Sequence, residues 1–96
     1  MRFANSVRFK VKNGKGSEFE KLIAKLPQLE GRLFTRVIKT GETTYCIFSE
    51  WESEEALIAG RPEMIRHLDS VRHLLEEISP ELGVTDPVSG PVVVSK

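Results

Sequence analysis

The chain has 96 residues, of which 40% are apolar and 29% are charged, and its 14 basic side chains balance 14 acidic ones. This composition predicts one globular domain over residues 1–96 and argues against disorder. Zero net charge argues against a nucleic-acid partner, which requires a basic face, and no apolar run approaches the ~20 residues that cross a membrane. A single cysteine cannot form a disulfide within the chain, so we expect a reducing, cytoplasmic location.

The N-terminal segment predicts a strand followed by a helix. Residues 3–11 alternate between apolar and polar side chains, which is typical of a half-buried strand. The sequence NGKG at 13–16 ends this strand in a turn. Ser17 begins the spacing of a helix capping box, and Pro27 is expected to end the helix.

Residues 31–51 contain the strongest strand signals in the chain. The sequence TGET at 40–43 suits a tight turn, so we predict a β-hairpin of strands 31–40 and 43–51. The second of these strands is apolar on both faces, with one face carrying Tyr45, Ile47 and Trp51 and the other carrying Cys46 and Phe48.

Two helices are predicted after the hairpin. Ser53 is placed to cap a short helix that Gly60 ends. Pro62 then opens the longest helix, which is expected to reach about residue 79. Helical spacing places one apolar seam along it, made of Met64, Leu68, Val71, Leu75 and Ile78.

The C-terminal residues 83–96 predict a loop followed by one short strand. GVTDPVSGP at 83–91 holds two glycines and two prolines, which favour a loop. PVVVS at 91–95 predicts a strand whose proline fits at the strand's start or on a sheet edge.

The element order is therefore β-α-β-β-α-α-β, which predicts a ferredoxin-like α+β sandwich with an antiparallel sheet. Helices in such a fold cover one face of the sheet. Strands that are apolar on both faces need a second cover, and no further helix is predicted to provide it. We therefore expect a homodimer that packs sheet face against sheet face.

Two segments resemble the antibiotic-biosynthesis monooxygenase family. VRFKVKNGKGSEFEKLIA at 7–24 resembles its first strand and helix, and TYCIFSEWESEEALIA at 44–59 resembles its third strand, tryptophan and following helix. The resemblance spans about residues 3–79 and implies a dimeric α+β barrel. The family includes cofactor-free monooxygenases of aromatic polyketides and quinols, haem-degrading enzymes and isomerases of small signalling molecules, so the fold alone does not settle function.

The haem-degrading branch of this family uses an asparagine on the first strand, the tryptophan, and a histidine on the following helix. Asn5 and Trp51 match the first two by position. Arg61 stands where the histidine is expected, and the nearest histidine is His67. The resemblance therefore does not extend to haem degradation, and we expect no haem to be bound through a histidine there.

Each candidate site residue has a structural alternative. The amide of Asn5 lies on the apolar face of its strand, where it either bonds to the backbone or donates to a ligand. Trp51 fills the core, lines a pocket, or does both. His67 is either a structural histidine or a general base, and Arg61 is either solvated or a clamp for an anion.

These residues predict a pocket between the sheet and the helices. The expected catalytic residues are Asn5, Trp51 and His67. The expected substrate-binding residues are Val7, Tyr45, Ile65 and Arg61.

Two functions of different classes fit this sequence. The first is a cofactor-independent monooxygenase acting on a small electron-rich aromatic, a quinol or phenol, which needs a dry pocket, a donor for the oxyanion and a modest base. Asn5 and Trp51 would be the donors and His67 the base. The second is a non-catalytic, dimeric small-molecule-binding protein of the same fold. Neither function requires a cofactor or a metal, and we expect none.

Overall fold

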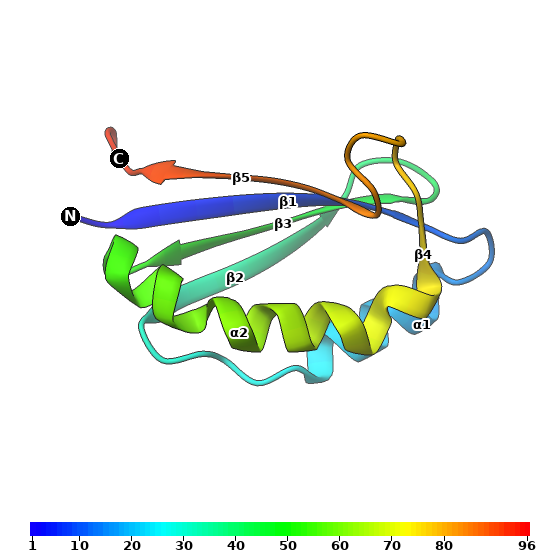
Figure 1. Ribbon diagram of the computed structural model, residues 1–96, viewed down its shortest axis with the longest axis horizontal. Helices are drawn as coiled ribbons and strands as arrows, with labels where there is room; N and C mark the ends of the chain where they lie inside the picture. Colours follow the sequence, from blue (N-terminus) through cyan, green and yellow to red (C-terminus); the bar gives the residue numbers. More distant parts are fainter.

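A computed structural model describes all 96 residues as a β-sheet with both helices on one side (Figure 1). The strands are β1 (Phe3–Val11), β2 (Arg32–Lys39), β3 (Thr44–Trp51), β4 (Leu75–Glu76) and β5 (Thr85–Pro91). The helices are α1 (Gly16–Lys25), α2 (Glu54–Val71) and a short 3-10 turn (Arg72–Leu74). Neither α1 nor α2 has the length and apolar character that a membrane-spanning helix needs.

The sheet is antiparallel, and β1 lies at its centre. The order runs β2-β3-β1, and both β4 and β5 pair with the remaining edge of β1. Both chain termini lie at the same end of this sheet (Figure 1). The predicted ferredoxin-like α+β fold is confirmed, and β5 takes the place of its last strand.

A cluster of buried side chains joins α1 and the end of α2 to the sheet. Its members are Phe9, Val11, Phe19, Tyr45, Val71, Leu74 and Leu75. The centroid of the Phe19 ring lies 4.9 Å from that of Tyr45 and 5.8 Å from that of Phe9, and both ring pairs are tilted. This cluster closes one end of the layer between sheet and helices.

The start of α1 differs from the prediction. The helix begins at Gly16 with Lys15 as its N-cap, and no side chain caps it. The reason lies in the preceding turn, where the Lys15 N–H donates to the Lys12 carbonyl and the Lys15 carbonyl already accepts from Phe19. Ser17 is therefore inside the first turn, and the predicted capping box is wrong. The helix does end before Pro27, as expected.

The two predicted helices after the hairpin are one helix. Ser53 caps it as predicted, because its Oγ accepts from the Ala56 N–H at 3.1 Å. However, Gly60 does not end the helix, and Pro62 lies inside it. A proline in this position withholds the N–H that would bond to the Ile58 carbonyl, and Ile58 is half exposed, so water can satisfy that carbonyl.

The same helix also ends earlier than predicted, at Val71 instead of about residue 79. The backbone of the next residues bonds to the sheet: the Lys12 N–H donates to the Leu74 carbonyl at 2.8 Å, and Leu75 pairs with Val11. The predicted apolar seam is therefore split, since Leu75 contributes to the core from a strand.

The C-terminal strand lies earlier in the chain than predicted. Residues 83–91 were expected to be a loop, yet most of them form β5 along the edge of β1, and 92–96 form no strand. The Val92 N–H donates to the Arg2 carbonyl, and hydrogen-bonded pairs alternate along an antiparallel ladder. Pro87 and Pro91 fall on the other positions, where the backbone nitrogen faces away from β1, so neither proline removes a ladder bond.

Candidate functional site

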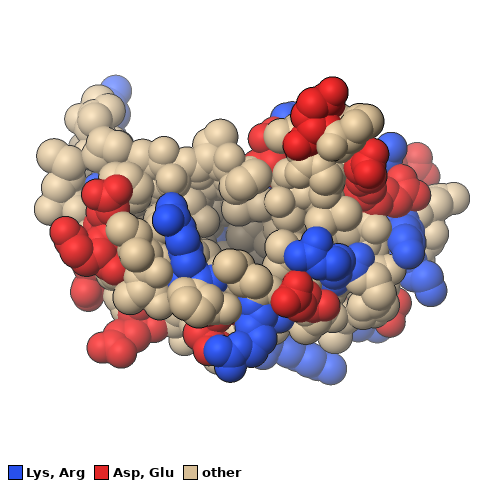
Figure 2. Space-filling view, in the orientation of Figure 1, with Lys and Arg blue, Asp and Glu red and all other residues tan.

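A cavity of about 820 Å³ lies between the inner face of the sheet and the helices. Figure 2 shows a hollow in the middle of the face toward the viewer, lined mostly by side chains that are neither acidic nor basic. Of its 23 lining residues 13 are hydrophobic. The others are Asn5, Gln28, Arg32, Thr35, Ser49, Arg61, His67, Thr85, Pro87 and Ser89. No aspartate or glutamate lines it.

The strand register places a row of polar side chains across the cavity floor. Thr35 pairs with Ser49, Ser49 pairs with Asn5, and Asn5 pairs with Ser89, so side chains from four strands lie side by side on one face. The hydroxyls of Thr35 and Ser49 are 3.1 Å apart. The neighbouring row is apolar and consists of Val37, Ile47, Val7 and Pro87. A flat ligand lying on this floor meets one polar band and one apolar band.

Asn5 is held in one orientation by Trp51. The indole Nε1 donates to the Asn5 Oδ1 at 2.8 Å, and an indole N–H can only donate, so the acceptor must be the amide oxygen. The amide nitrogen of Asn5 therefore points away from the indole with both of its hydrogens unused by any protein group. Asn5 is both a partner of a buried side chain and a donor that lines the cavity.

Trp51 itself does not line the cavity, which corrects the prediction. Its side chain is fully buried and packs beneath Gly60 of α2, where an added Cβ would lie 2.7 Å from the ring. The Arg32 guanidinium covers the ring at 5.7 Å from its centroid. The indole closes the end of the layer opposite the Tyr45 core, and it contacts two residues that line the cavity, Asn5 and Arg32.

Tyr45 is likewise buried in the core instead of lining the cavity. Its ring packs on Phe19, and its hydroxyl donates to the Glu20 Oε2 at 2.6 Å. Position 45 shares a strand face with Ile47, as predicted, but α1 covers this end of the face. The alternation along a strand predicts which face of the sheet a side chain lies on, but it does not predict which helix covers that side chain.

We expect the hydroxyl of Tyr45 to titrate late in the folded protein. Burial, then the hydrogen bond to Glu20 and the charge of that carboxylate, raise the pKa of Tyr45 from 10.0 to about 12. Stability from this neutral hydroxyl is complete below the unfolded pKa, and it is lost as pH rises from about 10 to about 12. Since Tyr45 is the only tyrosine, the ultraviolet absorbance of tyrosinate reports it alone.

The measurement compares the native protein with the protein in urea. The native midpoint should be higher, and Glu20→Gln should move it toward the unfolded value, because the substitution removes the charge and keeps an acceptor. Equal midpoints for the native and unfolded protein would contradict this prediction.

The second wall of the cavity is one face of α2. Residues at helical spacing line the cavity from this side, namely Leu57, Arg61, Met64, Ile65, His67, Leu68 and Val71. Four of the residues expected at the site line this cavity, namely Val7 from the sheet and Arg61, Ile65 and His67 from α2. The imidazole of His67 is half-buried and forms no hydrogen bond or ion pair with another residue of the chain, so it is free to meet a ligand. Asn5 and His67 therefore face one cavity from opposite walls.

Arg32 is a cavity residue that the sequence did not reveal. Its Nε donates to the Gln28 Oε1 at 2.6 Å, and its Nη2 donates to the Pro27 carbonyl at 3.2 Å. Burial lowers the pKa of this guanidinium from its ordinary value. Thr35, Ser49 and Ser89 were missed as well, although their period-two spacing from residues 37, 47 and 87 places them on the same face.

Nowhere in the structure do three or more His, Cys, Asp or Glu side chains gather so that they could hold a metal ion.

More than half of the chain matches a known protein family. Residues 2–60 match the family model for antibiotic biosynthesis monooxygenase, which is more than half of the chain. The chain belongs to this family. The matched region carries β1 to β3 and the first part of α2, including Asn5 and Trp51. No curated protein matches the chain at a significant level.

Solved structures share the fold of this family member at low sequence identity. SnoaB, a cofactor-independent oxygenase from Streptomyces nogalater, is 15% identical with a TM-score of 0.76, over 98% of this chain and 95% of SnoaB. A protein of unknown function from Nitrosomonas europaea is 20% identical with a TM-score of 0.79, over 99% and 92% of the two chains. A Mycobacterium tuberculosis protein is 16% identical with a TM-score of 0.75, over 99% and 98%. These similarities extend the shared fold past residue 60 to the C-terminal strand.

Proposed function

We propose that this protein is a cofactor-independent monooxygenase acting on a small electron-rich aromatic of the phenol or quinol class. The observation that carries the proposal is the cavity, in which a fixed amide donor and a free imidazole face one another across a mostly apolar space. The family supports a monooxygenase-like role, and SnoaB, which shares the fold, is a cofactor-independent oxygenase.

The amide of Asn5 suits an oxyanion. Its nitrogen faces away from the indole, because Trp51 occupies its oxygen, so the group presents a donor to the ligand. Removing a phenolic proton places negative charge on one oxygen, and a preorganised donor stabilises that charge best where water is excluded. Trp51 acts in this proposal as a positioning residue that orients Asn5, in place of the direct donor role expected from the sequence.

His67 would remove the phenolic proton. An imidazole is the side chain best suited to accept a proton near neutral pH. The phenolate would then give electrons to dioxygen, so that a new C–O bond forms at the ring carbon para to the hydroxyl. The proton taken by His67 returns to the distal oxygen of this peroxide adduct. Loss of water, which also removes the hydrogen of the para carbon, leaves a quinone, with one oxygen atom in the quinone and the other in water.

The test is oxygen uptake with 1,5-dihydroxynaphthalene as the probe, in isotopically labelled dioxygen. The expected product is a hydroxynaphthoquinone that holds one labelled oxygen atom, formed faster than without protein. His67→Gln should lower kcat by about 100-fold or more. His73→Gln is the matched control, since His73 is the other histidine, is exposed, and lies outside the cavity.

A product without labelled oxygen, or equal loss of activity in the two histidine variants, would contradict the proposal. The alternative function is a non-catalytic small-molecule-binding protein of the same fold. The observation that favours it is Arg61, which stands on α2 where the resemblance led us to expect a histidine. Saturable binding of the probe with no oxygen uptake would support this alternative.

We further propose that two copies pack through the outer face of the sheet. Both helices lie on the inner face, so nothing in one chain covers the outer one (Figure 1). Apolar side chains there include Phe34 and Phe48, with Ile38 and Val88 48% and 64% exposed. The resemblance to dimeric α+β barrels supports the same arrangement.

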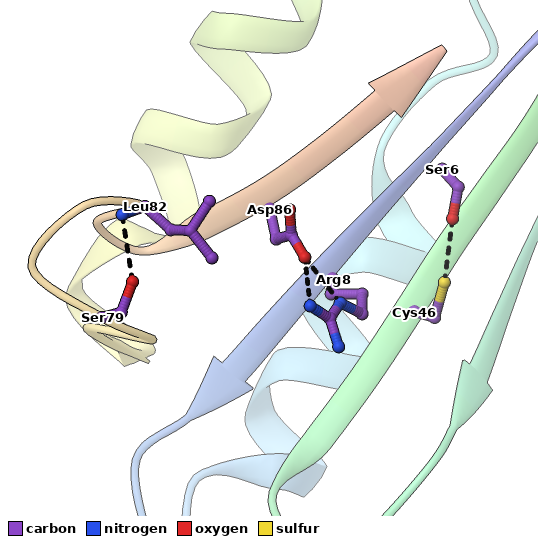
Figure 3. Close-up of polar contacts among 6 residues, drawn as sticks. All are labelled: Ser6, Arg8, Cys46, Ser79, Leu82 and Asp86. Atoms are coloured by element: carbon purple, nitrogen blue, oxygen red, sulfur yellow. Dashed lines mark hydrogen bonds and ion pairs between the residues drawn. The ribbon is translucent and has the colours of Figure 1, made fainter. Parts of the chain in front are cut away.

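Several polar groups of the outer face are already paired with one another. Arg8 is bonded to Asp86, and the Ser6 hydroxyl pairs with the Cys46 thiol (Figure 3). The distance between the Ser6 oxygen and the Cys46 sulfur is 3.1 Å. Paired groups can be covered by a partner with less loss of hydrogen bonding than single ones. Cys46 is a free thiol, and a reducing cytoplasm, which we propose as the location, would keep it so.

A further inference from the structure

The cavity carries positive charge without acidic counterparts. Two arginines, Arg32 and Arg61, are among its lining residues, and no carboxylate is. Elsewhere the arginines of this chain tend to be paired. Ion pairs are formed by Arg2, Arg8, Arg66 and Arg72, whereas neither Arg32 nor Arg61 has a carboxylate partner.

Arg32 is held in place by neutral groups only. Gln28 and the Pro27 carbonyl accept from its Nε and Nη2, and the Trp51 ring lies under it. These contacts fix the plane of the guanidinium and leave Nη1 without a protein partner. A fixed guanidinium with free N–H groups is well suited to bind a carboxylate, because the geometry is set before the ligand arrives.

Arg61 lies at the same end of the cavity as Arg32. The residue before it, Gly60, packs directly on the Trp51 ring, and the Arg32 guanidinium covers that same ring. Asn5, which bonds to the indole, shows that the cavity floor also reaches this end. Two cations therefore flank the Trp51 end of the cavity.

We infer that this end is a subsite for a carboxylate on a flat apolar ligand, held by Arg32 and Arg61. The inference rests on the proposed function, in that it takes the same cavity as the ligand site, and it narrows the substrate to aromatic acids. The aromatic body would lie across the polar and apolar rows of the floor, within reach of Asn5 and His67. The carboxylate would neutralise charges that the protein leaves unpaired.

Calorimetric titration with 2-naphthoate and its neutral analogue 2-naphthamide tests the inference. Wild-type protein should bind 2-naphthoate more tightly, by on the order of 10- to 100-fold, and higher salt should weaken only this probe. Arg61→Met should abolish most of the preference for 2-naphthoate over 2-naphthamide. Arg36→Met is the matched control, because Arg36 is on β2 like Arg32 but covers Phe34 and does not line the cavity.

Equal affinity for the two probes, or binding of neither at millimolar concentration, would overturn the inference, and so would an equal effect of the two arginine substitutions. The comparison of probes in wild-type protein needs no variant, so a folding defect in Arg61→Met would not leave the question open. This binding experiment is independent of the oxygen-uptake test with 1,5-dihydroxynaphthalene. Tight binding of 2-naphthoate by a protein that consumes no oxygen would therefore support the subsite and remove the oxygenase proposal.

Discussion

Gly60→Ala is expected to lower the free energy of unfolding by about 1–3 kcal/mol, the range for overpacking a well-packed site. An added Cβ would lie 2.7 and 2.9 Å from two carbons of the Trp51 ring. The ring cannot move aside easily, because it is fully buried and its nitrogen is bonded to Asn5. In an ordinary helix interior, glycine to alanine raises the free energy of unfolding by up to ~1 kcal/mol. The change expected for Gly60→Ala is therefore opposite in sign to the change that helix propensity predicts.

Urea unfolding followed by Trp51 fluorescence and circular dichroism measures this effect. Gly90→Ala is the matched control, since nothing lies within 4 Å of the position that its Cβ would take, and it should change stability by less than about 0.5 kcal/mol. An unchanged or increased stability of Gly60→Ala would show that α2 does not press on the indole.

Phe48→Asp is expected to convert the proposed homodimer into a monomer. A sheet-to-sheet interface should bury at least ~1,200 Å² in total, and a carboxylate at its centre would lose water without gaining a partner. We expect dimer affinity to fall by at least ~30-fold, or about 2 kcal/mol. Sedimentation at micromolar concentration should give twice the 10.8 kDa chain mass for wild type and the single mass for the variant.

Ile58→Asp is the control for the dimer prediction. Ile58 is an apolar side chain on α2 that is exposed to a similar degree as the apolar residues of the outer face, but it lies in the helical layer. Its substitution should leave the mass at twice the chain value. A wild-type protein that sediments at the single chain mass would contradict the dimer proposal directly.

The sequence predicted the strands of the sheet centre closely, because their side chains alternate. The predicted strand 3–11 matches β1, and 43–51 differs from β3 by one residue. The prediction from sequence failed for α2, because glycine and proline can either end a helix or lie inside one. Glycine commonly ends a helix, but here Gly60 lets α2 approach Trp51. Pro62 is tolerated because Ile58, whose carbonyl loses its helical donor, is half exposed. Neither use can be seen before the packing of the helix on the sheet is known.

The residues that line the cavity were predicted in part, for the same reason. The alternation of side chains along β1 indicated that Asn5 and Val7 share the inner face of the sheet, and both line the cavity. The α2 residues 61, 65 and 67 also line it. The covering element decided the rest, since α1 buries Tyr45 and α2 buries Trp51. Arg32 was missed because it lies next to the bulge between Arg32 and Phe34, where regular alternation no longer gives the facing of a side chain.

The two prolines that hid β5 in the sequence have a consequence for colloidal behaviour. β5 pairs only with β1, so its other backbone edge is open, and an open edge can template strand addition from another chain. The nitrogens that face this open edge include those of Pro87 and Pro91, which carry no hydrogen. An incoming strand therefore meets missing donors at two of the positions where it would need them, and this edge is protected against growth into aggregates.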